Sequence, residues 1–392
     1  MAGVQHTMTP SEETTIALVN CPYEEPCDEP DALLARYHSV TGWAGALVEA
    51  GADRVAVIQR FGRDARIRRE GVDYHFVADG AGSYPPSWFP GRRVVRTLSG
   101  LGARTVAVDG LCFPMLVRRL RRELGPAASI FVTDHGGFGA ESQFFRTWRH
   151  RRFYRFGLGG ATGFFFTARE QATPWIQAGI IRPAQGVHEV PEASTDLRAP
   201  SMATTPNERL PGRPALLWVG RLESNKDPLT VLDGLERAMP ALPEAALTMV
   251  YGDDPLLGEV RSRVERSSTL RGRVHLRGRL DRSELPAVYA GADAFVLGSH
   301  REVACFSLIE ALSFGLSPFV TDIPPFRVLT DGGRLGGLFR PGDAGELARA
   351  LAVLSEGDMA SRRASVRQHF ERALSWPAIG RRALAIYKGV PA

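Results

Sequence analysis

Short apolar runs alternate along most of this chain with longer segments of helical periodicity. In the first half, apolar runs predict strands at 14–20, 54–58, 72–77, 104–108, 129–134, 164–167 and 186–190. Apolar residues at helical spacing predict helices at 31–51, 93–101, 114–124 and 170–178. Strands that alternate with helices are typical of a parallel sheet covered by helices on both faces. The first half therefore predicts a doubly wound α/β domain.

The alternation stops in a segment rich in Ser, Thr, Asn and Pro and then starts again. We expect a first domain over residues 1–195, a linker over 196–213 and a second domain over 214–375. The second domain's strands are predicted at 215–220, 246–251, 273–277, 294–297 and 318–321. A final helix within 376–390 is expected to pack back on the first domain. Two such domains leave a cleft at the carboxyl ends of their strands, where ligands bind.

Composition indicates a soluble, cytoplasmic protein. Of the 392 residues, 44% are hydrophobic and 23% are charged, as in ordinary globular domains. No apolar run approaches the ~20 residues needed to span a bilayer. The first residues lack the basic and then apolar pattern of a secretion signal. The four cysteines are scattered without metal-binding spacing, which favours reduced thiols.

Residues 301–315 read R-E-V-A-C-F-S-L-I-E-A-L-S-F-G and follow a predicted strand. Ser307 is a suitable N-cap, so a helix is expected to start there with unpaired N–H groups that can bind an anion. Glu302 and Glu310 bracket this site. Ser307 and Glu310 could form a capping box with no further role, but that leaves Glu302 unexplained.

A second loop, V-G-R-L-E-S-N-K-D-P, follows the strand at 215–220. Gly220 allows close approach of the backbone to a ligand, and Arg221 and Lys226 supply a planar and a point-like cation suited to a diphosphate. Lys226 is one of only two lysines in the chain. An ordinary solvated loop is the alternative. Loops that follow parallel strands open on one edge of the sheet, so we expect both motifs to contact one ligand. The carboxylates would bind hydroxyl groups of that ligand and the cations would bind its phosphates. A nucleotide sugar carries both kinds of group.

The second domain resembles the family-4 retaining glycosyltransferases of the GT-B fold. Its matching motifs are, in order, V-G-R-x4-K (219–226), H-L-R-G-R-L-D-R-S-E-L (275–285), Y-x-x-A-D (289–293), E-x7-E (302–310), P-F-V-T-D-I-P (318–324) and G-L-F-R-P-G-D (337–343). The first domain matches more weakly, through S-V-T-G-W-A (39–44), T-D-H-G-G (133–137) and V-P-E-A-S-T (190–195). The resemblance implies two Rossmann-like domains that face an inter-domain cleft.

The resemblance also implies a role for each matching residue. Arg221, Lys226, Glu302 and His135 would be catalytic, with the two cations on the donor diphosphate and the other two near the transferred sugar. Donor contacts would come from Gly220, Arg279, Leu280, Phe306, Ser307, Leu308 and Glu310, with the ribose hydroxyls on Glu310 and the base near Arg279 and Leu280. His38, Thr41 and Gly42 would lie on the acceptor side. The family generally needs no metal, so neither metal nor cofactor is expected.

This chain departs from the family pattern in two loops. Val303 stands after the first glutamate, where most relatives have glycine. If that position needs a positive φ, a β-branched residue there would be strained, and the loop around Glu302 would take another shape. The first strand is followed by Cys21-Pro22-Tyr23-Glu24 instead of a glycine-rich turn. For His135, a loop histidine hydrogen-bonded to backbone is an equal alternative to a functional role.

Two basic stretches, 118–122 and 146–155, suggest contact with an anionic membrane or an acidic acceptor. A solvated arginine-rich face is the commoner explanation. Aromatic residues are interleaved with the arginines of the second stretch, which could suggest RNA, but no RNP, KH or OB signature supports nucleic-acid binding.

The sequence as a whole predicts a hexosyltransferase that moves a sugar from a nucleoside diphosphate to a hydroxyl of a glycan, lipid-linked or small-molecule acceptor, with retention. It would be cytoplasmic, with a peripheral contact at the inner membrane face as an open question. A nucleotide-sugar epimerase of the same architecture and a catalytically weak sugar-nucleotide-binding protein are the alternatives.

Overall fold

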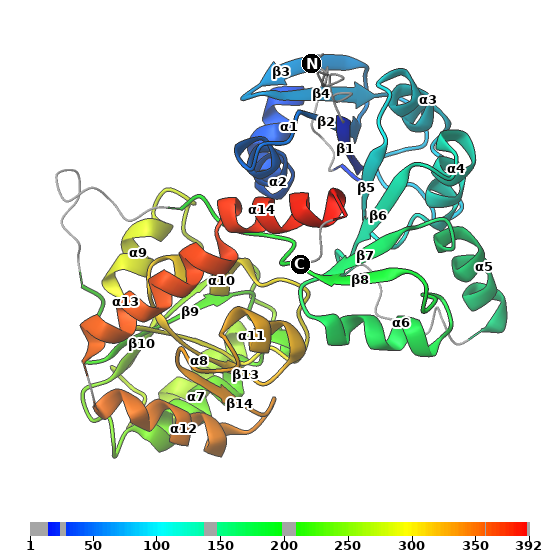
Figure 1. Ribbon diagram of the computed structural model, residues 1–392. Coiled ribbons are helices and arrows are strands. Elements are labelled where there is room, and N and C mark those ends of the chain that lie inside the picture. The colour runs from blue at the N-terminus through cyan, green and yellow to red at the C-terminus, as the bar shows by residue number, and fades with distance from the viewer. Residues whose placement is uncertain (1–14, 24–28, 137–146, 198–208, 357, 390–392) are drawn as a thin grey trace, which may run out of the picture.

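Two parallel sheets, each covered by helices, form the two halves of the chain (Figure 1). The computed structural model describes residues 15–23, 29–136, 147–197, 209–356 and 358–389. The first sheet has the strand order β3-β4-β2-β1-β5-β6-β7-β8, and the second has β11-β10-β9-β12-β13-β14. Neighbouring strands run parallel except β3, which pairs antiparallel with β4. The predicted doubly wound α/β fold is confirmed.

The first domain contains eight strands and six α-helices within the described residues. Its strands are β1 (Thr15–Asn20), β2 (Arg54–Arg60), β3 (Ala65–Arg69), β4 (Val72–Val77), β5 (Thr105–Asp109), β6 (Ser129–Thr133), β7 (Gly163–Phe166) and β8 (Gly186–Glu189). Its helices are α1 (Pro30–Arg36), α2 (His38–Glu49), α3 (Arg92–Gly100), α4 (Pro114–Leu124), α5 (Trp148–Leu158) and α6 (Thr173–Gln177). Along β1, alternate residues enter two separate apolar clusters, one on each face of the sheet. Both faces are therefore buried, as a parallel sheet requires.

Three elements of this domain differ from the predictions. The helix predicted at 31–51 is two helices, α1 and α2, because the backbone of Tyr37 is not helical (φ −93°, ψ 65°). Strand β3 was not predicted, because its sequence A-R-I-R-R is mostly exposed at the sheet edge and lacks an apolar run. Helix α5 was not predicted either, because large apolar rings lie on its exposed face as well as on its buried face.

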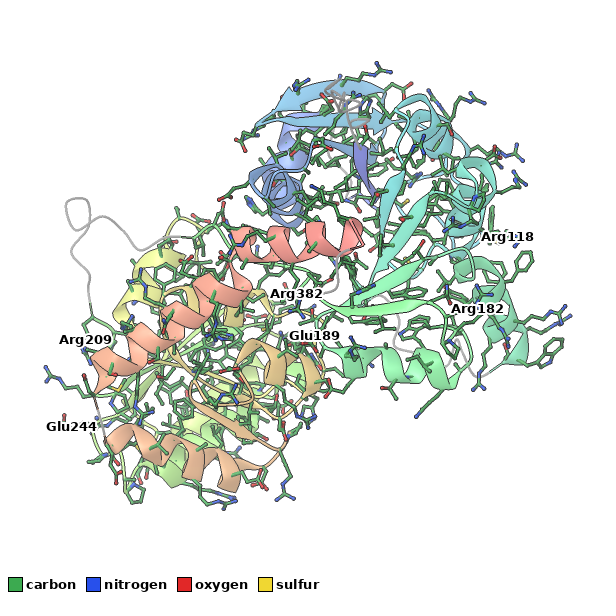
Figure 2. The ribbon with its side chains drawn as sticks, viewed as in Figure 1. Arg118, Arg182, Glu189, Arg209, Glu244 and Arg382 are labelled. Atoms are coloured by element: carbon green, nitrogen blue, oxygen red, sulfur yellow. The ribbon has the colours of Figure 1, made fainter. Side chains whose placement is uncertain are left out.

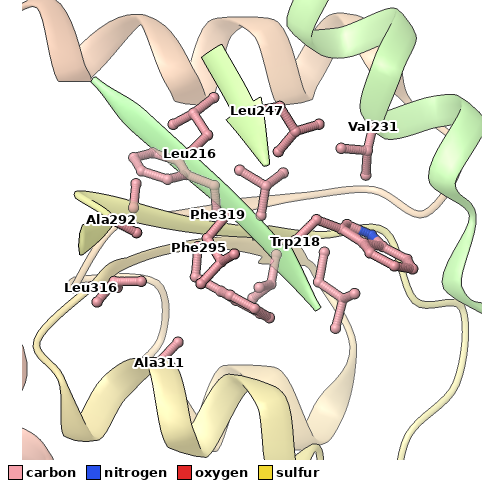
Figure 3. Close-up of a cluster of buried hydrophobic side chains, with 14 of the residues drawn as sticks. Leu216, Trp218, Val231, Leu247, Ala292, Phe295, Ala311, Leu316 and Phe319 are labelled. Atoms are coloured by element: carbon pink, nitrogen blue, oxygen red, sulfur yellow. The ribbon is translucent and has the colours of Figure 1, made fainter. Parts of the chain in front are cut away.

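The predicted strands of the second domain are confirmed, and α11, β14 and α13 are further elements that were not predicted. Its strands are β9 (Ala215–Gly220), β10 (Ala246–Tyr251), β11 (Val274–Gly278), β12 (Ala294–Leu297), β13 (Ser317–Thr321) and β14 (Gly337–Phe339). Its helices are α7 (Pro228–Ala238), α8 (Leu257–Arg266), α9 (Leu285–Gly291), α10 (Phe306–Ser313), α11 (Pro324–Leu329), α12 (Ala344–Ala352) and α13 (Met359–His369). Trp218, Phe295 and Phe319 come from three adjacent strands and are fully buried in one core (Figure 3).

The final helix, α14 (Trp376–Tyr387), leaves the second domain and packs beside α2 of the first (Figure 1). Two glycines allow the approach, because a Cβ at Gly42 would overlap the indole of Trp376 and one at Gly380 would overlap the carbonyl oxygen of Ala46. At the other end of the helix, the ring of Tyr387 stacks on Phe165 with centroids 5.4 Å apart. The chain thus crosses between the domains a second time. In the described part of the chain, no helix has the length and apolar character to cross a membrane.

Two glycine substitutions in this helix pair should have opposite effects. Gly380→Ala forces α2 and α14 apart, and overpacking of this kind lowers the free energy of unfolding by about 1–3 kcal/mol. Gly45→Ala on α2 is the matched control, because nothing lies within 4 Å of its added Cβ, and removing a helical glycine stabilises by about 0.5–1 kcal/mol. Melting temperatures of both variants provide the measurement. A Gly380→Ala protein as stable as wild type would contradict this packing.

Candidate active site

A pocket of about 540 Å³ opens at the carboxyl ends of β9, β10 and β11 and the start of α10. It brings together most of the predicted donor residues: Gly220, Arg221, Lys226, Arg279, Leu280, Glu302, Phe306, Ser307 and Glu310 all line it. The structure therefore places the two predicted loops around one space. Leu308 is the exception, since its side chain is fully buried in the core and its N–H is directed at the thiol of Cys305.

Glu310 is held in the wall of this pocket by groups that the sequence did not reveal. Helix α10 begins at Phe306 with Cys305 as its N-cap, so the prediction of Ser307 as the N-cap is wrong. Without that cap there is no capping box. The carboxylate of Glu310 instead accepts a hydrogen bond of 2.8 Å from the Tyr289 hydroxyl and lies 3.5 Å from Arg282. Glu310 is only 5% exposed, and this burial raises the pKa of its carboxyl while Tyr289 and Arg282 oppose the shift.

Lys226 and Glu302 form an ion pair of 2.5 Å between the two loops. Both side chains are nearly buried, with 12% and 10% exposure. Burial works against the charge on Lys226, but Cys305 and Glu302 more than offset it, so the pKa of the lysine is raised. Arg221 is 58% exposed and pairs with Glu223 at 2.9 Å. Of the two predicted phosphate cations, Lys226 is fixed in the pocket and Arg221 is at its rim.

The backbone around this ion pair is fixed by a short network. Asp227 has φ 41° and caps α7 by accepting the N–H of Thr230, so the predicted cap before Pro228 is confirmed. The Asn225 side chain bonds both the N–H and the carbonyl of Arg301. These bonds tie the loop after β9 to the loop after β12, and so set the position of Lys226 against Glu302.

Val303 does not take the strained conformation considered above. Its φ is not positive, and its side chain packs on Gly136 of the first domain, where any added Cβ would overlap it. Beside this contact, the Gln171 side chain donates to the carbonyl of Glu302 at 3.3 Å. The glutamate loop of the second domain therefore meets the histidine loop of the first, and Gly137 of that loop lies outside the described residues.

His135 lies between two carboxylates that the sequence reasoning missed. Its Nε2 is 3.0 Å from Asp109, and its Nδ1 contacts Glu192. Asp109 is the largest cause that raises the pKa of His135 well above its usual value; Glu192 adds to this and burial opposes it. Burial in turn raises the pKa of Glu192. The signal available in the sequence was a carboxylate at or shortly after the end of a strand: Asp109 ends β5 in V-A-V-D, and Glu192 follows β8 in H-E-V-P-E.

His135 borders two hollows in the first domain. One is a small cavity of about 50 Å³ that Ser39, Val40 and Trp43 of α2 also line. The other is a pocket of about 460 Å³ whose walls include Tyr84, Asp134 and Trp175. The predicted acceptor residues occupy the first turns of α2, where the Thr41 hydroxyl is 3.4 Å from the carbonyls of Tyr37 and His38 and Gly42 packs on Trp376. Their part in acceptor binding stays a prediction.

Comparison with known proteins agrees with this geometry. Residues 205–370 match the family model described as glycosyl transferases group 1. The second domain is a group 1 glycosyltransferase domain. The resemblance to family-4 enzymes is thereby confirmed for the domain that carries the E-x7-E and V-G-R-x4-K motifs.

Individual relatives match over less than half of the chain. A GDP-mannose:cellobiosyl-diphosphopolyprenol alpha-mannosyltransferase of Xanthomonas campestris is 31% identical over 170 residues, which are 42% of this chain and 44% of that protein. The sulfoquinovosyl transferase SQD2 of Arabidopsis thaliana is 32% identical over 148 residues, which are 37% of this chain and 27% of that protein. The chain thus covers less than half the length of these curated relatives.

Solved structures match over nearly the whole chain. Sucrose-phosphate synthase from Thermosynechococcus elongatus has a TM-score of 0.64 at 19% identity and covers 96% of this chain and 98% of its own. The lipopolysaccharide outer core galactosyltransferase WaaB has a TM-score of 0.66 at 16% identity, and the match covers 96% of this chain and 100% of that chain. These likenesses confirm the GT-B fold for both domains.

The protonation of His135 should depend on its two carboxylates. A raised folded-state pKa means that protonated His135 stabilises the fold below the unfolded value of about 6.5 and that this contribution is lost as pH rises through the folded pKa. Asp109→Asn removes the largest cause and should lower the pKa of His135. Titration of the histidine ring signals by NMR measures the pKa of His135 in the wild type and in the Asp109→Asn variant. A His135→Gln variant assigns the signal. A wild-type ring that titrates near 6.5 would contradict the geometry.

Proposed function

We propose that this protein is a retaining hexosyltransferase that moves a sugar from a nucleoside diphosphate to an acceptor hydroxyl. One observation carries the proposal: a single pocket holds a buried lysine, the start of α10 and a buried carboxylate within the group 1 domain. These groups match, in turn, the diphosphate, its oxygens and the ribose hydroxyls of a nucleotide sugar.

The donor would lie along the pocket with its phosphates toward Lys226. Lys226 and Arg221 would hold the diphosphate and stabilise the charge that grows on it as the glycosidic bond breaks. The N–H groups of Phe306 and Ser307, in the first turn of α10, would bind phosphate oxygens. Glu310, oriented by Tyr289, would accept the ribose hydroxyls, and Arg279 and Leu280 would contact the base.

Donor binding would rearrange the ion pair at the centre of the site. Lys226 is paired with Glu302 in the structure. A diphosphate offers the lysine a stronger anionic partner, and the carboxylate of Glu302 would then be available for the sugar hydroxyls. We propose that the reaction needs no metal or cofactor, because the two cations balance the charge of the leaving diphosphate.

The acceptor would approach from the first domain. The contact between Gly136 and Val303 places the His135 loop beside the Glu302 loop, and the 460 Å³ pocket opens next to it. There Asp109 and Asp134 can accept hydrogen bonds from hydroxyls, and the exposed ring of Tyr84 offers a flat apolar face of the kind on which sugar rings pack. Protonated His135, whose two ring nitrogens contact Asp109 and Glu192, would hold these carboxylates in place beside the transferred sugar.

We further propose that the acceptor is a glycan, a lipid-linked glycan or a small molecule, and that the enzyme works in the cytoplasm. The name of the Xanthomonas relative, which acts on a diphosphopolyprenol-linked sugar, supports a lipid-linked acceptor. An acceptor of that kind would bring the enzyme to the inner membrane face, where we propose a peripheral contact.

Incubation with labelled UDP-, GDP- and ADP-sugars tests the reaction class. A thermal-shift screen first identifies the nucleotide, because a ligand that binds only the folded state raises the melting temperature. We expect slow hydrolysis of the sugar without acceptor, transfer with acceptor, and the same rates in EDTA. Conversion of the sugar to its epimer would support a nucleotide-sugar epimerase, and failure to bind any nucleotide sugar would reject the proposal.

Lys226→Ala should abolish turnover more than it perturbs folding. Loss of one donor that stabilises the leaving group lowers kcat about 10²–10³-fold in comparable sites. Lys388→Ala is the matched control, since Lys388 is the only other lysine and is exposed at the end of α14. The double variant Lys226→Ala, Glu302→Gln avoids leaving a buried carboxylate unpaired. Wild-type kcat in a folded Lys226→Ala protein would show that the phosphates bind elsewhere.

Glu310→Gln should weaken nucleotide binding while the protein stays folded. The amide keeps the shape and can still accept from Tyr289, but it loses the charge that strengthens hydrogen bonds to ribose hydroxyls. Loss of a charged hydrogen bond costs about 1.5–3 kcal/mol, which is tenfold or more in Kd. Isothermal titration with the nucleotide measures this, and Glu259→Gln on the exposed face of α8 is the control. Unchanged affinity would leave Glu310 with a purely structural role.

A further inference from the structure

A wide groove between α4 and α5 is lined by arginines on the outer side of the first domain. Its volume is about 1360 Å³, and none of its described lining residues is acidic. Figure 2 shows Arg118 and Arg182 on the side of the first domain away from the second. The eight arginines of this arginine groove are Arg118, Arg119, Arg121, Arg122, Arg149, Arg152, Arg155 and Arg182. Eight cations with no acidic residue among the described lining residues make this groove a strongly basic surface.

Four of these eight arginines make hydrogen bonds or ion pairs within the protein. Arg121 donates to the carbonyls of Gly160 and Ala128, at 2.9 and 2.7 Å, and so joins α4 to the loops beside it. Arg182 donates to a carbonyl of the same region, and Arg119 and Arg122 share Glu123. The other four are Arg118, Arg149, Arg152 and Arg155, and no carboxylate pairs with them in the described chain. These cations remain available to an external anion.

The outer face of α5 carries large rings among these cations. Trp148, Arg152 and Phe156 follow one another at helical spacing of four residues, and the two rings are 69% and 51% exposed. The guanidinium of Arg118 on α4 lies 3.5 Å from the Phe156 ring centroid. The opposite face of α5 is buried through Tyr154 and Leu158. The helix therefore has one face in the core and one face that combines apolar rings with unpaired cations.

Such a face fits the interface of an anionic bilayer. There the rings enter the boundary between headgroups and acyl chains, and the guanidinium groups meet lipid phosphates while their stems cover apolar surface. Single-stranded nucleic acid fits less well. Trp148 and Phe156 are eight residues apart, which is about 12 Å along the helix, and the Arg118 guanidinium covers one face of Phe156, so the two rings form no continuous platform for stacked bases.

We propose that the arginine groove docks the protein on an anionic phospholipid surface, with Trp148 and Phe156 at headgroup level. The proposal rests on the peripheral membrane contact of the proposed function and names the residues that make it. It requires no donor chemistry, so a test of binding alone separates its failure from a failure of the glycosyltransferase assignment.

Co-sedimentation of the full chain with lipid vesicles tests the proposal. We expect binding to phosphatidylcholine vesicles that contain about a third phosphatidylglycerol, none to pure phosphatidylcholine, and release as salt screens the charges. The variant Arg149→Glu, Arg152→Glu should lower the affinity at least tenfold. Its matched control, Arg237→Glu, Arg261→Glu, makes the same charge change at exposed arginines of α7 and α8 and should bind as wild type does.

A second variant tests the rings separately from the charge. Trp148→Ala keeps every arginine and removes an exposed side chain, so it should fold normally and bind these vesicles several-fold more weakly. Equal binding to vesicles with and without phosphatidylglycerol would overturn the proposal. So would an equal loss of vesicle affinity in the two charge-reversal variants. So would preferential binding of a labelled single-stranded RNA at the same ionic strength, which would make the groove a nucleic-acid site.

Discussion

The ion pair between Lys226 and Glu302 is the interaction on which the candidate site depends. It joins the loop after β9 to the loop after β12, and both residues are nearly buried. Charges taken out of water are costly unless they are paired, so each loop constrains the other. Around this pair, Asp227 caps α7 and Asn225 bonds the backbone of Arg301. The pocket is thereby shaped before a ligand arrives, and a diphosphate would replace one anion by another.

The same loop also joins the two domains. Glu302 accepts a hydrogen bond from Gln171 through its carbonyl, and Val303 packs on Gly136 next to His135. A glycine at position 303 would leave that contact empty. The valine that looked like a departure from the family pattern therefore acts as a packing residue at the domain junction. Val303 and helix α14, which returns to α2, together place the pocket that holds Lys226 beside His135 of the first domain.

The sequence predicted best what depends on local pattern. Strands β9, β10 and β12 match their apolar runs residue for residue, because their side chains are buried on both faces. The convergence of Arg221, Lys226, Glu302 and Glu310 on one pocket followed from the rule that loops after parallel strands share an edge. What escaped prediction depends on contacts between distant segments. Tyr289 meets Glu310 across 21 positions of sequence, and Glu192 meets His135 across 57. No local periodicity encodes such pairs.

Helix α5 shows why a failed prediction can itself be informative. A helix that only packs on a domain has apolar residues on one stripe and polar residues elsewhere, which gives a clear period. In α5 the outer face also carries Trp148 and Phe156, beside the exposed Arg149, Arg152 and Arg155. The apolar signal therefore extends around the helix and the period is lost. A second apolar environment facing the outer side of α5 would account for this pattern. Arg149 and Arg152, which have no carboxylate partner among the described residues, favour an environment whose surface is anionic.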